Sequence, residues 1–318
     1  MSNPEPHLRI LSLGAGVQSS ALLILAARGD LPKLDAAIFS DTGWEPQAVY
    51  AHLDRLEEEV AKPAGIPIYR VRSGNIRADA LNPEARFATI PLFVKNADGS
   101  QGLVRRQCTS EYKLKPIKRK VRELLGFPHP NPIPKGHFVE QWIGISTDER
   151  SRALDADGNL KVGDVKYSRN SYPLLDLDMS RDHCRSLLTT HGFGLTPKSA
   201  CIGCPFHTNA HWRAIKEDTA SWADAVDFDK QIRNGSARAN AQGQPLNGQA
   251  FLHRSMLPLD EAPISRDGFK VWAGRQGDVL HMLDIAEFEE KLDAEDRDSL
   301  TGCSPFGCTT DDEGEDAA

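Results

Sequence analysis

The chain has 318 residues, 40% hydrophobic and 26% charged, which is typical of a water-soluble globular protein with a large core. Its formal net charge of −7 excludes a wholly basic nucleic-acid-binding surface, and no apolar run approaches the roughly 18 residues of a membrane span. The first residues lack the charged-then-apolar pattern of a secretory signal, so we expect a cytoplasmic protein with no membrane partner.

The N-terminal segment predicts a buried strand, a tight turn and a helix. Apolar residues from Leu8 to Leu13 indicate the strand, and the apolar run from Ala21 to Ala27 indicates the helix. The small residues between them let backbone N–H groups approach a phosphate at the positive end of the helix, with Ser19 and Ser20 as further donors. No Gly-Lys-Ser/Thr follows, so this is not a Walker loop. A turn that binds nothing is the alternative.

The next segments predict further strands of one parallel sheet. Residues 36–39 and 68–71 are short apolar runs separated by a helical pattern, and residues 138–145 form another strand. Because ligands of open α/β sheets lie beyond the carboxyl ends of the strands, Asp41 is expected near the first loop. For the same reason, the charged segment 148–152 is a candidate substrate contact.

A basic helix follows an isolated cysteine. The segment from Lys113 to Arg122 holds six cations, with apolar residues along one side, and Cys108 lies just before it. A thiol near a helix start and several cations has a lowered pKa, which suits a metal ligand or a nucleophile. A solvated basic helix without chemistry is the alternative.

Two of the other five cysteines form a C-x-x-C pair, Cys201 and Cys204. This spacing lets two thiolates hold one iron or zinc ion, or close a redox disulfide. Cys184 shares a helical face with leucines and is expected in the core more than at a metal. A zinc ribbon needs a second close pair, and the remaining candidates, Cys303 and Cys308, lie far along the chain.

The rest of the chain predicts an irregular segment at 73–102, a helix over 212–232 and a polar loop over 234–249. A charged helix is expected around 287–291, and residues 311–316 form an acidic, disordered tail.

Taken together, these segments resemble the phosphoadenylylsulfate (PAPS) reductase family of the PP-loop, adenine nucleotide α-hydrolase-like superfamily. The family's motifs occur in order: Ser-Leu-Gly with Val-Gln-Ser-Ser, Ser-Asp-Thr-Gly, Cys-x4-Lys-x2-Pro, Trp-x-Gly and Tyr-Pro-Leu-Leu-Asp. The resemblance implies a doubly wound, Rossmann-like α/β sheet over residues 1–205. A mostly helical extension over 206–300 and a cysteine-bearing acidic tail over 301–318 would follow.

The resemblance also implies site residues. Lys113 and Arg150 fall where the family contacts phosphate or sulfate. The residues implied to bind the adenine nucleotide lie in the first loop and at the end of the second strand. They are Ser12, Gly14, Gly16, Gln18, Ser19, Ser20 and Asp41.

The chain departs from the family pattern at two places. Gln18 replaces the aspartate of the ATP-cleaving members, as in the reductase branch. Cys108 stands alone where cluster-bearing reductases have a double cysteine, so Cys108, Cys201 and Cys204 give three sulfur ligands for an oxygen-sensitive [4Fe–4S] cluster. Cys184, His207 or an exogenous ligand would be the fourth. Zinc held by the three thiolates and His207 is the alternative.

Three functions follow as hypotheses. The first is a PAPS reductase-like enzyme that binds adenylylsulfate or PAPS, attacks it with Cys303 or Cys308, and uses an external thiol reductant to release sulfite. The second is an ATP-dependent adenylating sulfurtransferase that takes sulfur from a donor and delivers it to a nucleic acid. The third is a zinc-stapled nucleic-acid-binding module with residues 113–122 as its basic face.

Overall fold

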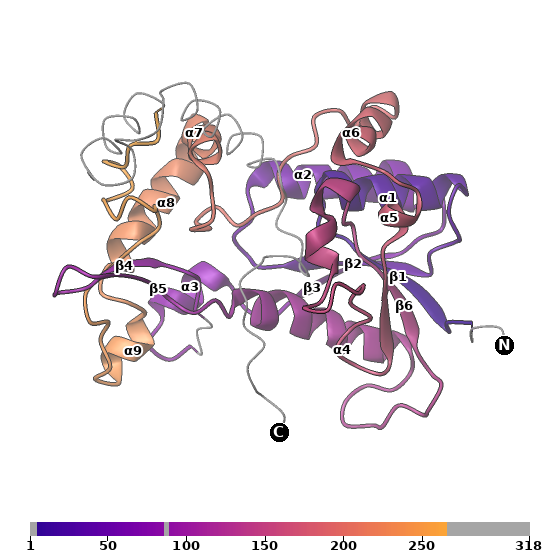
Figure 1. Ribbon diagram of the computed structural model, residues 1–318, viewed down its shortest axis with the longest axis horizontal. Coiled ribbons are helices and arrows are strands. Elements are labelled where there is room, and N and C mark those ends of the chain that lie inside the picture. The colour runs from indigo at the N-terminus through magenta and orange to yellow at the C-terminus, as the bar shows by residue number, and fades with distance from the viewer. Residues whose placement is uncertain (1–4, 86–88, 266–318) are drawn as a thin grey trace.

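The computed structural model describes residues 5–85 and 89–265. These residues form an α/β protein with two sheets (Figure 1). None of the helices in these ranges has the length and apolar character needed to cross a membrane. The expected helix near 287–291, the acidic tail, Cys303 and Cys308 lie outside the described residues.

The larger sheet has five parallel strands in the order β3-β2-β1-β6-β7. Its strands are β1 (Leu8–Ser12), β2 (Ala36–Asp41), β3 (Ile68–Arg72), β6 (Val139–Trp142) and β7 (Ser168–Ser171). The apolar runs predicted as strands lie in this sheet, where Leu11 and Phe39 point to one face and Ile10 and Ile38 point to the other. Both faces are therefore apolar and need helices to cover them.

Helices cover both faces, so the sheet is doubly wound. On one face lie α1 (Val17–Arg28), α2 (Gln47–Leu56) and α6 (Arg181–Thr190). On the other face, α4 (Lys115–Leu124) packs Ile117 and Val121 against β1, β2 and β6 (Figure 1). The expected fold class of residues 1–205 is thus confirmed for its central sheet.

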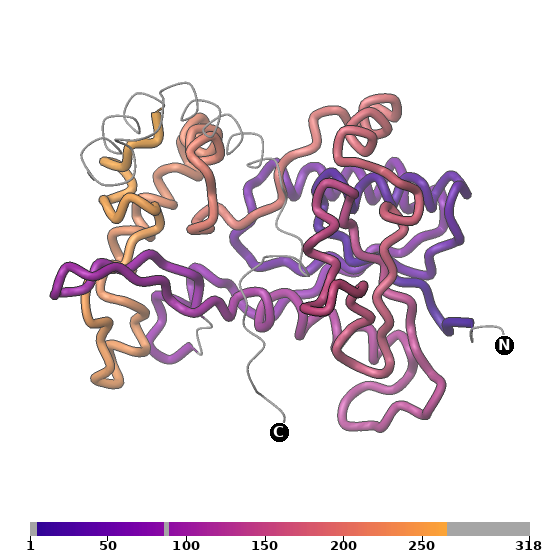
Figure 2. The backbone as a smooth tube through the Cα atoms, in the orientation of Figure 1, coloured from indigo at the N-terminus to yellow at the C-terminus, as the bar shows by residue number. Residues whose placement is uncertain are grey.

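A second unit is built around a three-stranded antiparallel sheet in the order β5-β4-β8. Its elements are α3 (Ile76–Leu81), β4 (Phe93–Lys95), β5 (Gln101–Leu103), α7 (Asn209–Glu217), α8 (Thr219–Gln231), α9 (Ala237–Ala241) and β8 (Gln249–Phe251). Residues of α3, α7, α8 and β8 share one core that includes Trp44, Trp212 and Phe228. Far along the sequence, the chain comes back to this sheet, where β8 pairs with β4 (Figure 2).

This second unit corrects three expectations. Its core joins residues from both sides of the predicted boundary at 205, since β4 pairs with β8. The expected helix over 212–232 is two helices, because Asp218 ends α7 and caps the N-terminus of α8. The segments 73–102 and 234–249 are also more ordered than their polar, Gly-rich composition predicts, because α3, β4 and α9 lie within them.

The remaining helical segments connect the sheet to the site. A π-helical turn, Glu57–Ala61, extends α2, and a second, Thr109–Leu114, leads from Cys108 into α4. A 3-10 segment, Thr147–Ala153, follows β6, and α5 (Pro173–Asp176) follows β7. Short π-helices occur frequently at functional sites, and the second one here carries Lys113.

Candidate functional site

The order of the five strands places the candidate site beyond the carboxyl ends of β1 and β6. The chain leaves β1 to one side of the sheet through α1, and it reaches β6 from the other face through α4. Neighbouring strands whose connections diverge leave a crevice between their loops, where ligands of this fold class bind. The loop after β1 is the Gly14–Ser20 segment, so the sequence-derived phosphate loop lies at this switch point.

Backbone geometry opens the first turn of α1 to an anion. Gly16 is the N-cap in an extended conformation, and no side chain caps the helix. The amides of the first turn have no carbonyl partner within a helix, so they attract negative charge. Ser19 Oγ braces the turn, since it accepts from the Gly14 amide at 3.2 Å and donates to the Gly16 carbonyl at 3.3 Å. Ala15 holds a left-handed φ of 55° within this turn.

A glycine-dependent contact on one side and an ordinary van der Waals contact on the other hold the loop. A Cβ atom on Gly144, just after β6, would lie 2.9 Å from the Ser19 amide nitrogen. From the other side, a Cβ atom on Gly16 would lie 3.6 Å from Ser199 Cβ. The loop is therefore held between β6 and the segment that leads to the C-x-x-C pair.

Three side chains predicted to bind nucleotide are engaged elsewhere. Ser20 Oγ lies 3.0 Å from His52 Nε2 in the buried layer between α1 and α2, which corrects its assignment as a loop donor. Ser12 Oγ accepts from Gln141 Nε2 at 2.7 Å within the sheet, so its hydroxyl also faces the core. Gln18 points across the switch point to Ser146 Oγ at 3.4 Å and Glu149 Oε2 at 3.3 Å.

Asp41 shapes the loop after β2. Its Oδ1 accepts from the Gly43 amide and from Tyr50 Oη, both at 2.7 Å, and its Oδ2 pairs with Arg72 at 2.7 Å. Burial and the hydrogen bond to Asp41 raise the pKa of Tyr50 well above its ordinary value, so Tyr50 acts as a donor. The carboxylate thus fixes the turn that carries Trp44 toward the C-x-x-C segment.

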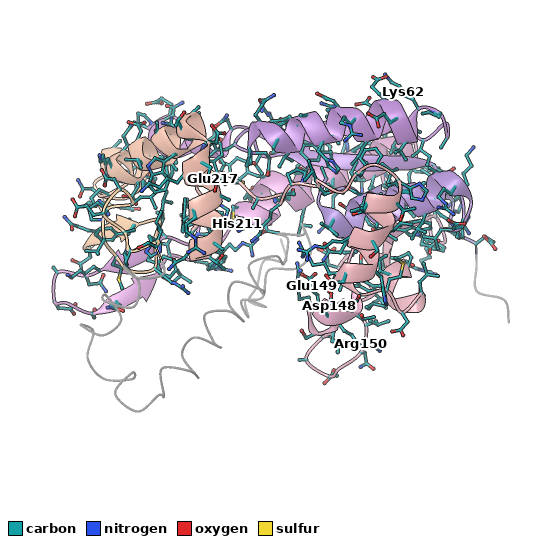
Figure 3. All side chains as sticks on the ribbon, turned by 90° about the horizontal axis from the view of Figure 1, so that it is seen from above. Lys62, Asp148, Glu149, Arg150, His211 and Glu217 are labelled. Atoms are coloured by element: carbon teal, nitrogen blue, oxygen red, sulfur yellow. The ribbon has the colours of Figure 1, made fainter. Side chains whose placement is uncertain are left out.

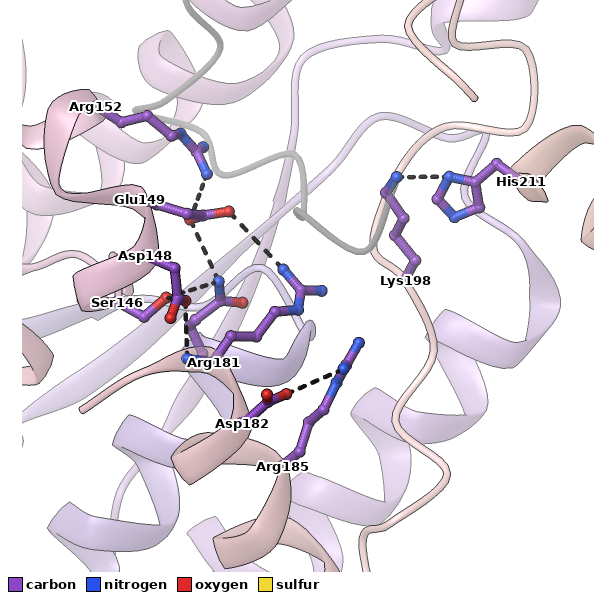
Figure 4. A network of polar contacts seen from close by, with 10 residues as sticks. Ser146, Asp148, Glu149, Arg152, Arg181, Asp182, Arg185, Lys198 and His211 are labelled. Carbon is purple, nitrogen blue, oxygen red and sulfur yellow. Dashed lines mark hydrogen bonds and ion pairs between the residues drawn. The ribbon is translucent and has the colours of Figure 1, made fainter. Parts of the chain in front are cut away.

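An arginine–carboxylate cluster lies beside Gln18; the sequence predicts its segment 148–152 as a substrate contact but not its third member, Arg181. Glu149 is buried and pairs with Arg152 and, at 3.8 Å, with Arg181 Nη1 of α6 (Figure 4). Burial raises the pKa of Glu149 against the opposing effect of both arginines. Some N–H groups of both arginines are buried without a hydrogen-bond partner. In the sequence, the arginines of segment 148–152 are the feature that indicates this cluster.

Arg150, the residue predicted from that segment, is exposed instead. In Figure 3 it lies at the outer end of the segment, on the far side of Asp148 and Glu149 from His211. The segment is a 3-10 turn, and its geometry directs Glu149 and Arg152 inward and Arg150 to solvent. Arg152 is therefore the better candidate for an anion contact.

Three cysteines predicted to converge do line one cavity. Cys108, Cys201 and Cys204 surround it together with Lys113, and Trp44 closes one side. We call this the cysteine cavity. Lys113 is buried there on its π-helix, as its assignment to the site requires. Because Ser199 lies against the first loop only two residues before Cys201, the cysteine cavity borders the phosphate loop.

The surroundings of Cys201 favour a neutral thiol. Its Sγ lies 3.1 Å from Thr42 Oγ1 and 3.8 Å from Glu45 Oε1. Burial, and next the Glu45 carboxylate, raise the pKa of Cys201 well above its ordinary value, with Lys113 opposing. Burial also raises the pKa of Glu45, whose Oε2 is buried without a hydrogen-bond partner. A thiolate at Cys201 needs a positive partner beyond Lys113.

The other proposed ligands lie apart from the cysteine cavity. His207 Nε2 donates to the carbonyls of Cys201 and Ile202, at 2.9 and 3.1 Å, and thereby closes the C-x-x-C turn. Cys184 is buried in the core between α1 and α6, where burial raises its pKa to about 12. Within residues 5–85 and 89–265, no three histidine, cysteine or acidic side chains are gathered closely enough to hold a single metal ion.

No family model and no curated protein matches the sequence. Among solved structures, the chain is similar to a phosphoadenylyl-sulfate (PAPS) reductase from Candida auris in a phosphate complex. The two share 14% sequence identity at a TM-score of 0.34, over 61% of this chain and 76% of that one. The function proposed below therefore rests on the residues of the site.

Proposed function

We propose that the chain is a PAPS reductase-like enzyme that binds an adenine nucleotide in the Gly14–Ser20 loop and performs sulfur chemistry at the adjoining cysteines. The nucleotide phosphates would lie on the first-turn amides of α1, where no side chain competes for them. Arg152 borders the same switch point and is suited to bind further oxygen atoms of the ligand, and Gln18 holds the neighbouring Glu149.

One observation carries this proposal: Cys108, Cys201 and Cys204 reach one cavity from distant parts of the sequence, beside the phosphate loop. Three cysteines that line one cavity are unusual for a core without chemistry. They suit a metal or a redox step, and Lys113 offsets negative charge on them.

The donor set fits an iron–sulfur cluster in kind, since cysteine thiolates are its usual ligands. Cys108, Cys201 and Cys204 would hold such a group, and the cavity of about 30 Å³ would widen to admit it. When bound, it would supply a redox-active or sulfur-binding centre beside the nucleotide. Zinc is the alternative, and neither Cys184 nor His207 lies where it completes the shell.

In the reductase form, a cysteine thiolate attacks the sulfate sulfur of adenylylsulfate or PAPS. A sulfur–sulfur bond forms, the bond from sulfur to the phosphate oxygen breaks, and the nucleotide leaves with both electrons of that bond. A thiol of an external reductant then attacks the cysteine sulfur, which releases sulfite and leaves a disulfide. Cys303 and Cys308 stay the candidate nucleophiles, and truncation after Leu300 tests them: unchanged turnover would assign the step to another thiol.

An ATP-dependent sulfurtransferase acting on nucleic acid is the second candidate. The observation that favours it is the set of three cysteines lining the cavity, because a cluster with three protein ligands keeps one iron open to bind sulfur. The third hypothesis, a zinc-stapled nucleic-acid module, has less support. The cations of α4 that would form its basic face include Lys115, Lys118 and Lys120, each paired with a carboxylate of this chain.

One experiment separates these functions. Anaerobically purified full-length protein is incubated with ATP, adenylylsulfate or PAPS, and AMP, pyrophosphate and sulfite are measured. Sulfite from a sulfonucleotide supports the reductase, and pyrophosphate from ATP supports the transferase. Iron and sulfide analysis with the absorption spectrum tests the cluster independently of turnover. Colourless protein with one zinc ion after anaerobic reconstitution would contradict it.

A further inference from the structure

A second cavity lies between α6 and α7, beside the phosphate loop. It has a volume of about 380 Å³, and Val17, in the first turn of α1, forms part of its wall. Cavities of this size hold small ligands. We call it the α6–α7 cavity.

The charged side chains among the described residues of its wall are all cations. Arg181 and Arg185 extend from α6 toward the segment that carries Lys198 and toward His211 of α7 (Figure 4). None of the described residues that line the cavity is acidic. Asp182 pairs with Arg185 at 3.3 Å, and Glu149 approaches Arg181, but both carboxylates lie outside the lining. Three cations, with no acidic side chain among the described lining residues, attract a negatively charged group.

His211 adds a neutral donor. Its Nδ1 lies 2.5 Å from Lys198 Nζ, and an ammonium can only donate, so Nδ1 accepts. Burial and the neighbouring His207 and Lys198 lower the pKa of His211 to about 2, so the ring is neutral. A neutral ring that accepts through Nδ1 carries its proton on Nε2. The Nε2–H group therefore adds an uncharged donor to the three cations of the cavity.

Arg181 is the second, independent sign of a ligand. The residue is 8% exposed, and its Nε and Nη1 atoms are buried without a hydrogen-bond partner. Nη1 faces Glu149 Oε1 at 3.8 Å, which is too long for a hydrogen bond, and Nε has no partner at all. Buried donors of this kind are costly unless a ligand satisfies them, and arginine N–H groups match the oxygen atoms of phosphate or sulfate.

From this geometry we infer that the α6–α7 cavity binds the phosphate or sulfate group that follows the α-phosphate of the bound nucleotide. The inference rests on the proposed nucleotide site, because Val17 joins the first turn of α1 to the cavity wall. The α-phosphate lies on the helix amides, and the next anionic group enters among Arg181, Arg185 and Lys198. The cavity thereby distinguishes ATP or adenylylsulfate from AMP.

Arg185→Gln tests this inference, because Arg185 is partly exposed and its loss spares the buried pair of Arg181 and Glu149. Calorimetric titration of the anaerobically purified full chain uses AMP, ATP, adenylylsulfate and adenosine 3′,5′-bisphosphate. The substitution is expected to weaken ATP or adenylylsulfate binding about 10- to 100-fold and AMP binding less than about twofold. Arg185→Lys should restore part of the affinity, since it keeps the charge but not the planar fork.

Lys62→Gln is the matched control, because Lys62 is an exposed cation that pairs within its own helical segment, with Glu58 (Figure 3). A loss equal for AMP and ATP, a loss shared by Lys62→Gln, or one confined to the 3′,5′-bisphosphate would overturn the inference. If the unsubstituted protein binds none of these nucleotides, the proposed function itself fails. If it binds them and Arg185→Gln changes nothing, only the subsite fails.

Discussion

At the scale of single residues, the site depends on close backbone approach. Gly144 lies against the first turn of α1, where a Cβ atom would meet the Ser19 amide at 2.9 Å and Gln18 Cβ at 3.2 Å. The crowding atoms belong mainly to backbone, which cannot rotate away as a flexible side chain can.

Gly144→Ala should therefore lower the free energy of unfolding by about 1–3 kcal/mol, because the added methyl group forces the loop and β6 apart. Urea unfolding measures this change. The control is Gly102→Ala, since the corresponding Cβ atom meets nothing within 4 Å. Equal stability of the two variants would show that the loop tolerates the displacement.

Ser19 and Ser20 are neighbours with opposite surroundings, and their alanine variants should separate binding from stability. Ser19→Ala removes the hydroxyl that braces Gly14 and Gly16, so nucleotide affinity should fall about 2- to 10-fold. Ser20→Ala leaves His52 without its partner in the core, so stability should fall by about 1–3 kcal/mol with unchanged affinity. Calorimetric titration and urea unfolding of both variants test this; a reversed pattern would contradict the orientation of α1.

At the scale of elements, the segment 198–204 joins the two loops of the site. The Ile202 amide donates to the Trp44 carbonyl at 2.8 Å, and a Cβ atom on Gly203 would lie only 2.0 Å from the Trp44 ring. Cys201 and Cys204 are therefore positioned by the loop after β2.

Gly203→Ala should displace this segment, lower stability by about 1–3 kcal/mol and reduce the metal content of anaerobically isolated protein. Trp44→Leu removes the ring atoms that cause the clash. If the clash is the cause, Gly203→Ala should cost less in the Trp44→Leu background, which a double-mutant cycle measures. Additive effects would place the cause elsewhere.

At the scale of the whole molecule, buried neutral histidines link stability to pH. His253 accepts from the Ser255 amide through Nδ1 and contacts Asn209 Oδ1 through Nε2, at 3.1 and 2.9 Å. Burial lowers its pKa from 6.5 to about 3. Between those values the unfolded chain binds a proton that the folded chain does not, so stability falls as pH decreases through this window.

Replacement of His253 by Gln should reduce this dependence. From pH 7 to pH 5, His253 contributes a loss of about 2 kcal/mol in the unsubstituted protein, and the variant lacks it. Urea unfolding at pH 7 and pH 5 gives the change in the free energy of unfolding for each protein. An equal change in both would show that His253 protonates in the folded state without cost.

Local patterns by themselves determined four of the five strands of the central sheet and the place of its first loop. Apolar runs in β1, β2, β3 and β6, with helical spacing between β2 and β3, are a property of neighbouring residues and survive any tertiary arrangement that buries both faces. The position of the phosphate loop and of Asp41 followed from the parallel order of the strands.

Only the tertiary structure decided which side chains turn toward the site. Arg152 rather than Arg150 points inward, and Ser20 turns to His52, because contacts with α6 and α2 select those directions. The pairing of β4 with β8 and the cations gathered from α6 and Lys198 join segments distant in sequence. Such partners leave no periodic signal, since their closeness depends on how the two units pack together.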